Sequence, residues 1–372
     1  MKERQHIYYF DYLRIIAAIC VIFMHTAAGP LRGEVDLDWQ FMNIITSFAF
    51  TAVPLFFMMS GYLLISSEKT ADISVLMKKR LPRLVLPLCG WTVVAILWSM
   101  FLARDFSPVS LYNRILTSFH SPASAHLWYM YTLIAVYLIS PVISGGIRAL
   151  DKKGKIFVAI LAFLPTFKLI AMLLLPTAVD QFLNFDFITK LEFFSGYLCP
   201  FIIGYALGSL EKKISNWILV PSAVVVWVII IIGTYVRTVE TGQYNQAYQH
   251  QAAGFEVLLA SILFLIFKQN FNKQSWFTKR IPLVPLSLPI YLMHNILLSM
   301  MFSVGFSNSN IIKILFMTFL NLVICFFVMK TVATIKPLCF IATGMPYKEA
   351  CNTCNWVYTY RWIKEALSKR KQ

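Results

Sequence analysis

About ten apolar stretches, each close to the length that crosses a bilayer, limit the fold of this 372-residue chain more than any other feature. Hydrophobic residues make up 58% of the chain and charged residues only 13%, whereas a soluble domain carries about 25% charged residues. Lipid offers the backbone no hydrogen-bond partners, so such stretches must be helical. We expect an all-α, polytopic transmembrane bundle of about ten helices, with spans near 12–29, 41–65, 84–103, 125–147, 156–175, 187–209, 217–236, 251–268, 283–303 and 311–331.

The basic residues gather in alternate connections between these stretches. Such a bias marks the cytoplasmic side of a multi-pass protein and predicts that both termini are cytoplasmic. It also accounts for the net charge of +16 without nucleic acid, because no basic stretch forms a separate soluble domain. We therefore expect a multi-pass protein of the cell membrane, with basic inner connections at 66–83, 148–155, 210–216 and 269–282.

The C-terminal residues differ in pattern from the rest. Trp356, Tyr360, Ile363 and Leu367 repeat at helical spacing among basic residues. This pattern predicts a transmembrane domain over 1–335 and a cytoplasmic, basic, amphipathic tail over 336–372 that contacts membrane lipids. Homo-oligomerisation is left open. The pair Cys351 and Cys354 has no second pair to complete a zinc site, so we expect no metal.

Two ionisable residues interrupt the first apolar stretch, Arg14 and His25. An arginine at the centre of a membrane helix costs about 2.5–3.5 kcal/mol, so such residues are by default functional. Eleven residues separate the two, which at about 100° per residue returns His25 to within about 20° of Arg14. One face of the helix therefore presents a cation near its start and an imidazole deep in the span, about 16 Å further along.

Further polar groups follow in the next spans. Ser60 and Gly61 indicate either a helix-packing face or the lining of a tunnel. Arg80 and Arg83 serve either to set topology or to bind phosphate through charge-assisted, bidentate hydrogen bonds. His126 begins the fourth span, where it is either an interface anchor with its neighbour Trp128 or part of an acceptor site.

The later spans carry an intramembrane carboxylate, Glu256, and three hydrogen-bonding groups at i, i+4 and i+7. These three, Ser287, Tyr291 and His294, share one helix face and need partners in lipid.

The order of these motifs resembles that of the membrane acyltransferase-3 family: Arg14 and His25, Phe57-X-X-Ser60-Gly61-Tyr62, Arg80-X-X-Arg83, His126-Leu-Trp128, and Ser287-X-X-X-Tyr291-Leu-X-His294. The resemblance implies an O-acyltransferase that moves an acyl group, here expected to be acetyl, from cytosolic acyl-CoA to a cell-envelope glycan or lipid-linked sugar. We assign its catalytic residues as His25, Arg14, His294 and Tyr291. Donor binding falls to Arg80, Arg83, Ser60 and Arg14, and acceptor binding to His126, Trp128 and Glu256.

Two other functions remain open on sequence grounds. A secondary transporter or permease-like protein would also have about ten spans with charges at their midplane, but its mark is a two-fold repeat of hydropathy, which we do not find. A structural partner of a glycan-export complex would tolerate changes at all the ionisable positions.

Overall fold

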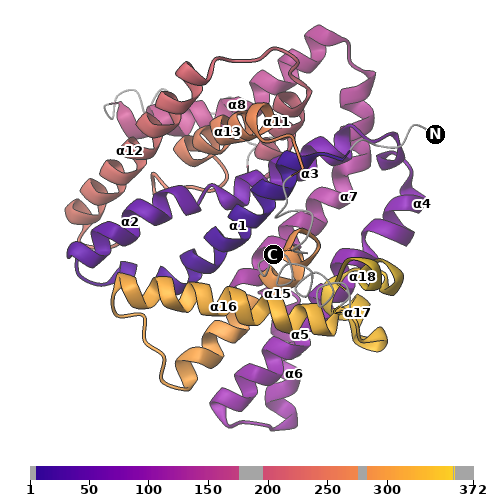
Figure 1. The fold of residues 1–372 in the computed structure, drawn as a ribbon, viewed down its shortest axis with the longest axis vertical. Helices are drawn as coiled ribbons and strands as arrows, with labels where there is room; N and C mark the ends of the chain where they lie inside the picture. The colour runs from indigo at the N-terminus through magenta and orange to yellow at the C-terminus, as the bar shows by residue number, and fades with distance from the viewer. Residues whose placement is uncertain (1–5, 176–195, 275–282, 355, 357–372) are drawn as a thin grey trace, which may run out of the picture. The chain divides into compact units, whose positions relative to one another are not determined.

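The computed structural model describes residues 6–175, 196–274, 283–354 and Trp356 (Figure 1). Throughout these ranges the chain forms helices joined by turns and loops, without a β-strand. The expected all-α fold is therefore confirmed. Most of the predicted amphipathic tail helix, from residue 357 onward, lies outside the described residues.

Eight helical stretches in the described part of the chain are long and apolar enough to cross a membrane. They are Tyr8–Ala27, Leu37–Ile65, Ile73–Ala103, Ala125–Ala149, Lys152–Leu174, Asn216–Thr241, Leu283–Ser303 and Ile311–Val332. Two further expected spans correspond to shorter helices, α11 (Leu198–Ser209) and α13 (Gly254–Asn270). The segment 187–195 of the sixth expected span lies outside the described residues. The multi-pass helical fold is thus confirmed, while the side on which each connection lies stays a prediction.

The second expected span, 41–65, is not one continuous helix. It consists of α2 (Leu37–Ala49) and α3 (Ala52–Ile65), separated by a turn in which the Thr51 hydroxyl donates to Phe48 O at 2.7 Å. Pro54 explains the break, because proline lacks an N–H and is tolerated in the first turn of a helix but not in its interior. The break places Pro54 at the third position of α3.

The chain divides into two compact units. The first is formed by the described parts of Met1–Leu76, Ala135–Lys273 and Phe306–Thr318. It contains α1 (Tyr8–Ala27), α2, α3, α8 (Lys152–Leu174), α11, α12 (Asn216–Thr241) and α13. The second unit contains α5 (Pro82–Ala103), α6 (Pro108–Ser118), α15 (Leu283–Ser303), α17 (Lys336–Thr343) and α18 (Tyr347–Cys354). Helices α7 (Trp128–Ala149) and α16 (Ile311–Val332) contribute residues to both units.

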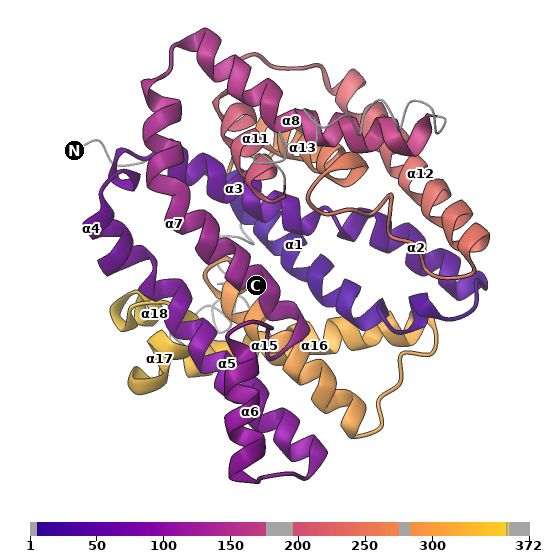
Figure 2. The same cartoon turned by 180° about the vertical axis from the view of Figure 1, so that it is seen from behind.

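In the first unit, α3 and α11 touch backbone to backbone (Figure 2). A Cβ on Gly61 would lie 1.7 Å from Phe201 O, and a Cβ on Gly204 would lie 2.1 Å from Met58 O. Each helix therefore supplies a glycine where the other's backbone passes, the usual way in which membrane helices approach closely. Helix α1 joins this core through Phe10, whose ring contacts those of Tyr62 and Phe264.

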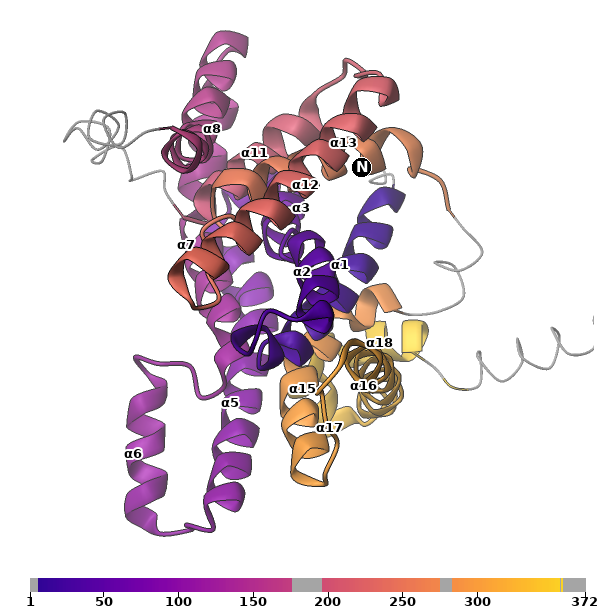
Figure 3. The ribbon, with the colours of Figure 1, turned by 90° about the vertical axis from the view of Figure 1, so that its left-hand side faces the viewer.

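In the second unit, α5 and α6 run side by side in opposite directions (Figure 3). Arg114 Nη1 of α6 donates to Ser99 Oγ of α5 at 2.8 Å. Tryptophan side chains tie α5 to two more helices: Trp98 Nε1 donates to Ser299 Oγ of α15, and Trp91 Nε1 donates to Ala342 O of α17, both at 3.0 Å. The indole N–H groups thus find partners within the protein rather than at a lipid interface.

The contact between α3 and α11 predicts that Gly204→Ala is destabilising, because its Cβ overlaps Met58 O and the helices must move apart. We expect a loss of about 1–3 kcal/mol in the free energy of unfolding, measured on purified protein in detergent. The matched control is Gly146→Ala in α7, where a Cβ meets nothing within 4 Å. That substitution is expected to be neutral or stabilising by up to about 1 kcal/mol. Equal effects of the two substitutions would contradict the packing described.

Candidate functional site

Arg14 and His25 both lie on α1, and each side chain is half-buried. The helix packs against α2, α3 and α13 of the first unit. His25 lies in the last turn of α1, nearer the end of the helix than the expected span of 12–29 implies. The helix ends at Ala27, and a short 3-10 helix, Pro30–Arg32, follows after Gly29.

Glu256 lies in the first turn of α13 and is completely buried. Neither of its carboxylate oxygens has a hydrogen-bond partner among the described residues. The carboxylate is close enough to interact electrostatically with Cys20 of α1 and with Tyr244. Since a buried carboxylate without partners is costly, this position suits a group that receives hydrogen bonds from a ligand.

A buried polar cluster that the sequence analysis missed lies in the same unit. Gln249 Nε2 donates to Ser47 Oγ at 3.1 Å and to Asn43 Oδ1 at 3.4 Å, and Gln249 Oε1 accepts from the Tyr244 hydroxyl at 2.5 Å. Asn43 Nδ2 in turn donates to Ile231 O of α12. The signal was present in the sequence, because Asn43 and Ser47 lie one turn apart within an apolar stretch.

Ser60 is half-buried on α3, next to the glycine that touches α11. Of the two alternatives open for the Ser60–Gly61 pair, the structure supports helix packing for Gly61. The role of Ser60 in donor binding stays a prediction.

His126 is the centre of a hydrogen-bond network in the second unit. The peptide oxygen of Leu292 can only accept, so His126 Nε2 must carry the proton that forms the 3.0 Å bond to it. Nδ1 then accepts from the Ser124 hydroxyl at 3.0 Å, and Ser124 Oγ accepts from Asn295 Nδ2 at 3.1 Å. Both ring nitrogens of His126 are therefore engaged in joining the segment before α7 to α15.

Tyr291 and His294 lie on α15 beside His126, and all three residues are buried. The Tyr291 hydroxyl donates to His126 O, and the rings of His126 and His294 lie 5.0 Å apart. His294 Nδ1 donates to Tyr291 O at 2.5 Å, which leaves Nε2 as the basic nitrogen of the His294 ring. Asn321 Nδ2 fixes the backbone at the same point by donating to His294 O. Of the three residues on the predicted face, Tyr291 and His294 therefore meet His126, whereas the Ser287 hydroxyl donates to Val284 O of its own helix at 2.8 Å.

Trp128 is half-buried at the first position of α7, and its ring meets that of Tyr129 edge to face at 6.3 Å. Tyr129 in turn contacts Tyr291, with ring centroids 5.3 Å apart. The structure therefore brings the His126–Trp128 motif next to the motif of α15.

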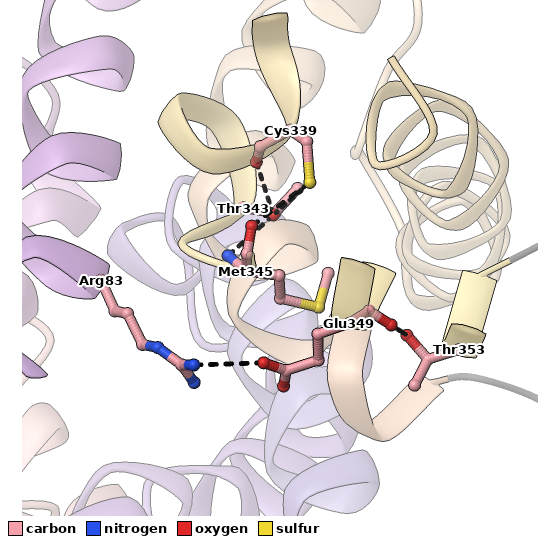
Figure 4. Close-up of polar contacts among 6 residues, drawn as sticks. All are labelled: Arg83, Cys339, Thr343, Met345, Glu349 and Thr353. Atoms are coloured by element: carbon pink, nitrogen blue, oxygen red, sulfur yellow. Dashed lines mark hydrogen bonds and ion pairs between the residues drawn. The ribbon is translucent and has the colours of Figure 1, made fainter. Parts of the chain in front are cut away.

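Arg80 and Arg83 lie at the start of α5, Arg80 in a wide helical turn (Leu76–Arg80) and Arg83 at the second helical position. Arg83 is exposed and donates from Nη2 to Glu349 Oε2 of α18 at 3.2 Å (Figure 4). The two side chains are each 47% exposed, so the ion pair is open to water and to competing anions.

The turn between α17 and α18 holds Glu349 in this place. Gly344 has φ +71°, and a Cβ there would lie 2.2 Å from Arg83 O, so only glycine fits between the turn and α5. Inside the turn, Thr343 Oγ1 donates to Cys339 O at 2.6 Å and accepts from Met345 N at 3.1 Å (Figure 4). Burial raises the pKa of the Cys339 thiol, which remains protonated and donates to Met345 O.

Comparison with known proteins gives a family match. The family model of acyltransferase 3, described as an acyltransferase domain, covers residues 7–330. No curated protein and no solved structure matches the chain significantly. The matched range includes every site residue predicted from the sequence and ends within α16, so α17 and α18 lie beyond it.

The network around His126 predicts a structural penalty on its removal. His126→Ala leaves Leu292 O without its side-chain donor and Ser124 without its acceptor, so we expect a loss of about 1–3 kcal/mol in unfolding free energy. Thermal unfolding in detergent checks this, with His120→Ala in an exposed loop as the matched control. An unchanged stability of His126→Ala, with acyl transfer abolished, would instead give His126 a direct role in the reaction.

Proposed function

The chain belongs to the acyltransferase 3 family, and from this premise we propose that it moves an acyl group, acetyl in the first instance, from cytosolic acyl-CoA to a hydroxyl of a cell-envelope glycan or lipid-linked sugar. The observation that carries the proposal is the family match over residues 7–330. That range contains both the helix with Arg14 and His25 and the paired arginines at the start of α5. The eight apolar helical stretches make it a membrane acyltransferase.

His25 is the residue that we assign to proton transfer. A neutral imidazole accepts the proton of the acceptor hydroxyl while the hydroxyl oxygen attacks the thioester carbonyl. The new C–O bond forms, the C–S bond breaks, and the CoA thiolate takes the proton from the imidazolium. In the alternative, the imidazole itself attacks the thioester carbonyl, and the C–S bond breaks to release the CoA thiolate. The acceptor hydroxyl then attacks the acyl-imidazole, the C–N bond breaks, and the hydroxyl proton passes to the thiolate. Arg14, on the same helix, supplies a positive charge to the donor side.

Arg80 and Arg83 suit the phosphates of CoA. Guanidinium groups form bidentate, charge-assisted bonds to phosphate, and the charge bias of the connections predicts a cytoplasmic position for both residues. Arg83 already binds an anion, the carboxylate of Glu349, in an exposed and therefore replaceable ion pair. We propose that the donor phosphates displace Glu349 from Arg83.

The acceptor needs groups that bind sugar hydroxyls and sugar rings. Glu256, buried in α13 without hydrogen-bond partners among the described residues, can accept bonds from hydroxyl groups. The half-buried indole of Trp128 offers an aromatic face. The basic Nε2 of His294, held by the bond from Nδ1 to Tyr291 O, is a second candidate for proton transfer.

The experiment that tests the proposal uses sealed, inside-out membrane vesicles supplied with radiolabelled acetyl-CoA. Wild-type protein is expected to transfer label to envelope glycan. His25→Ala is expected to reduce the rate by a factor of about 10²–10⁴, the usual contribution of general acid–base catalysis. His120→Ala, the same substitution at an exposed loop position, is the matched control and keeps the wild-type rate.

Undiminished transfer by His25→Ala, with the protein still in the membrane, would contradict the role of His25. A transporter or a structural partner of an export complex gives no transfer from acetyl-CoA even with wild-type protein, so the same assay separates these functions from the one proposed.

The ion pair between Arg83 and Glu349 predicts that Glu349 competes with acyl-CoA for Arg83. Glu349→Gln removes a negative charge from Arg83, and exposed pairs contribute about 0.2–1 kcal/mol. We therefore expect the KM for acyl-CoA to fall by a factor of up to about 5, with kcat unchanged. Glu68→Gln removes another exposed carboxylate elsewhere and should leave KM unchanged.

The double variant isolates the contact between the two side chains. In an Arg83→Ala background, Glu349→Gln should no longer affect the KM for acyl-CoA. If it still lowered KM to the same extent, the effect would come from overall charge and not from the pair with Arg83.

A further inference from the structure

A groove with a volume of about 610 Å³ lies between α8 and α11 of the first unit. Its floor on α8 is a single apolar stripe, Ile156, Ile160, Phe163 and Phe167, spaced at i, i+4, i+7 and i+11. Ile202 and Ala206 of α11 face this stripe across the groove. The proposed reaction makes no use of any of these residues.

One end of the groove is positively charged. Lys152 and Lys155, in the first turn of α8, line it together with Ser209 at the last position of α11. These two lysines are the charged side chains among the described residues that line the groove. The nearest carboxylate on α8, Asp151, caps the helix by accepting from Gly154 N at 2.7 Å. The charge bias of the connections predicts that this end lies at the cytoplasmic surface.

The length of the groove along α8 matches the thickness of one leaflet of a membrane. From Lys155 to Phe167 the helix rises by about 18 Å, close to the half-thickness of about 15 Å of a bilayer's hydrocarbon core. A molecule in the groove would therefore have an anionic group at the inner surface and an apolar chain that reaches toward the bilayer centre.

We propose that this groove is a binding site for an anionic glycerophospholipid of the inner leaflet. The phosphate lies between Lys152 and Lys155, and one acyl chain lies along the stripe of α8. The charged side chains that line this end of the groove are both cationic, which favours a headgroup of net negative charge over a zwitterionic one. The site is independent of the acyl-transfer reaction.

The alternative is that the two lysines only orient the helices in the membrane. Lys212 and Lys213 provide the control for it, because they are exposed on the next basic connection, with the same predicted side and the same charge, but do not line the groove. Neutralising either pair changes the charge equally, and only one of the pairs belongs to the proposed site.

The test is native mass spectrometry of the full-length protein in detergent, titrated with phosphatidylglycerol or with phosphatidylcholine of identical acyl chains. Wild-type and Lys212→Gln/Lys213→Gln protein should bind phosphatidylglycerol at least tenfold more tightly than phosphatidylcholine. Lys152→Gln/Lys155→Gln should abolish that preference. Free glycerol 3-phosphate, which has the phosphate without the chains, should not displace the lipid.

A second variant tests the apolar part of the site. Ile160 is 61% exposed, so Ile160→Trp can fill the groove without disturbing the core, and it should weaken binding of both lipids. Equal binding of the two lipids by wild-type protein, or an unchanged preference in Lys152→Gln/Lys155→Gln, would overturn the proposal.

Discussion

In the hydrocarbon core of a membrane, polar groups have no water to hydrogen-bond and must find partners within the protein. The structure of each of the two units depends on these internal hydrogen bonds. In the second unit, His126 and Asn321 both donate to backbone carbonyls of α15, at Leu292 and His294. In the first unit, Gln249 joins α2 to the loop before α13 through Asn43 and Ser47. These hydrogen bonds hold His126 against α15 and tie α2 to the loop before α13. Glu256 differs from these residues, because its buried carboxylate has no hydrogen-bond partner in the described structure.

Local patterns allowed much of the fold to be predicted from the sequence. Runs of apolar residues located the spans, and the spacing of Tyr291 and His294 placed both on one buried face. The break at Thr51 was missed, although Pro54 signalled it, because hydropathy alone joins α2 to α3. The pair of Arg83 with Glu349 had no local signal at all, since 266 residues separate its partners and only the docking of α17 on α5 brings them together.

The proposed chemistry divides its parts among different helices. Helix α1 contributes the imidazole of His25, α5 contributes the arginines for the donor, and α13 contributes a carboxylate for the acceptor. Helices α17 and α18 lie beyond the family match, and α18 supplies the acidic residue Glu349, which forms an ion pair with Arg83. If Arg83 binds the donor as proposed, this exposed ion pair competes with the donor phosphates for the same guanidinium group.

The proposed reaction takes its acyl group from a cytosolic thioester and delivers it to an acceptor in the cell envelope. The most direct measurement compares sealed inside-out with sealed right-side-out vesicles, both given radiolabelled acetyl-CoA, to which membranes are impermeable. Labelled glycan is predicted only from inside-out vesicles, where the predicted topology exposes the arginines of α5 to the added donor. Equal labelling in both orientations, or labelling from right-side-out vesicles alone, would contradict it.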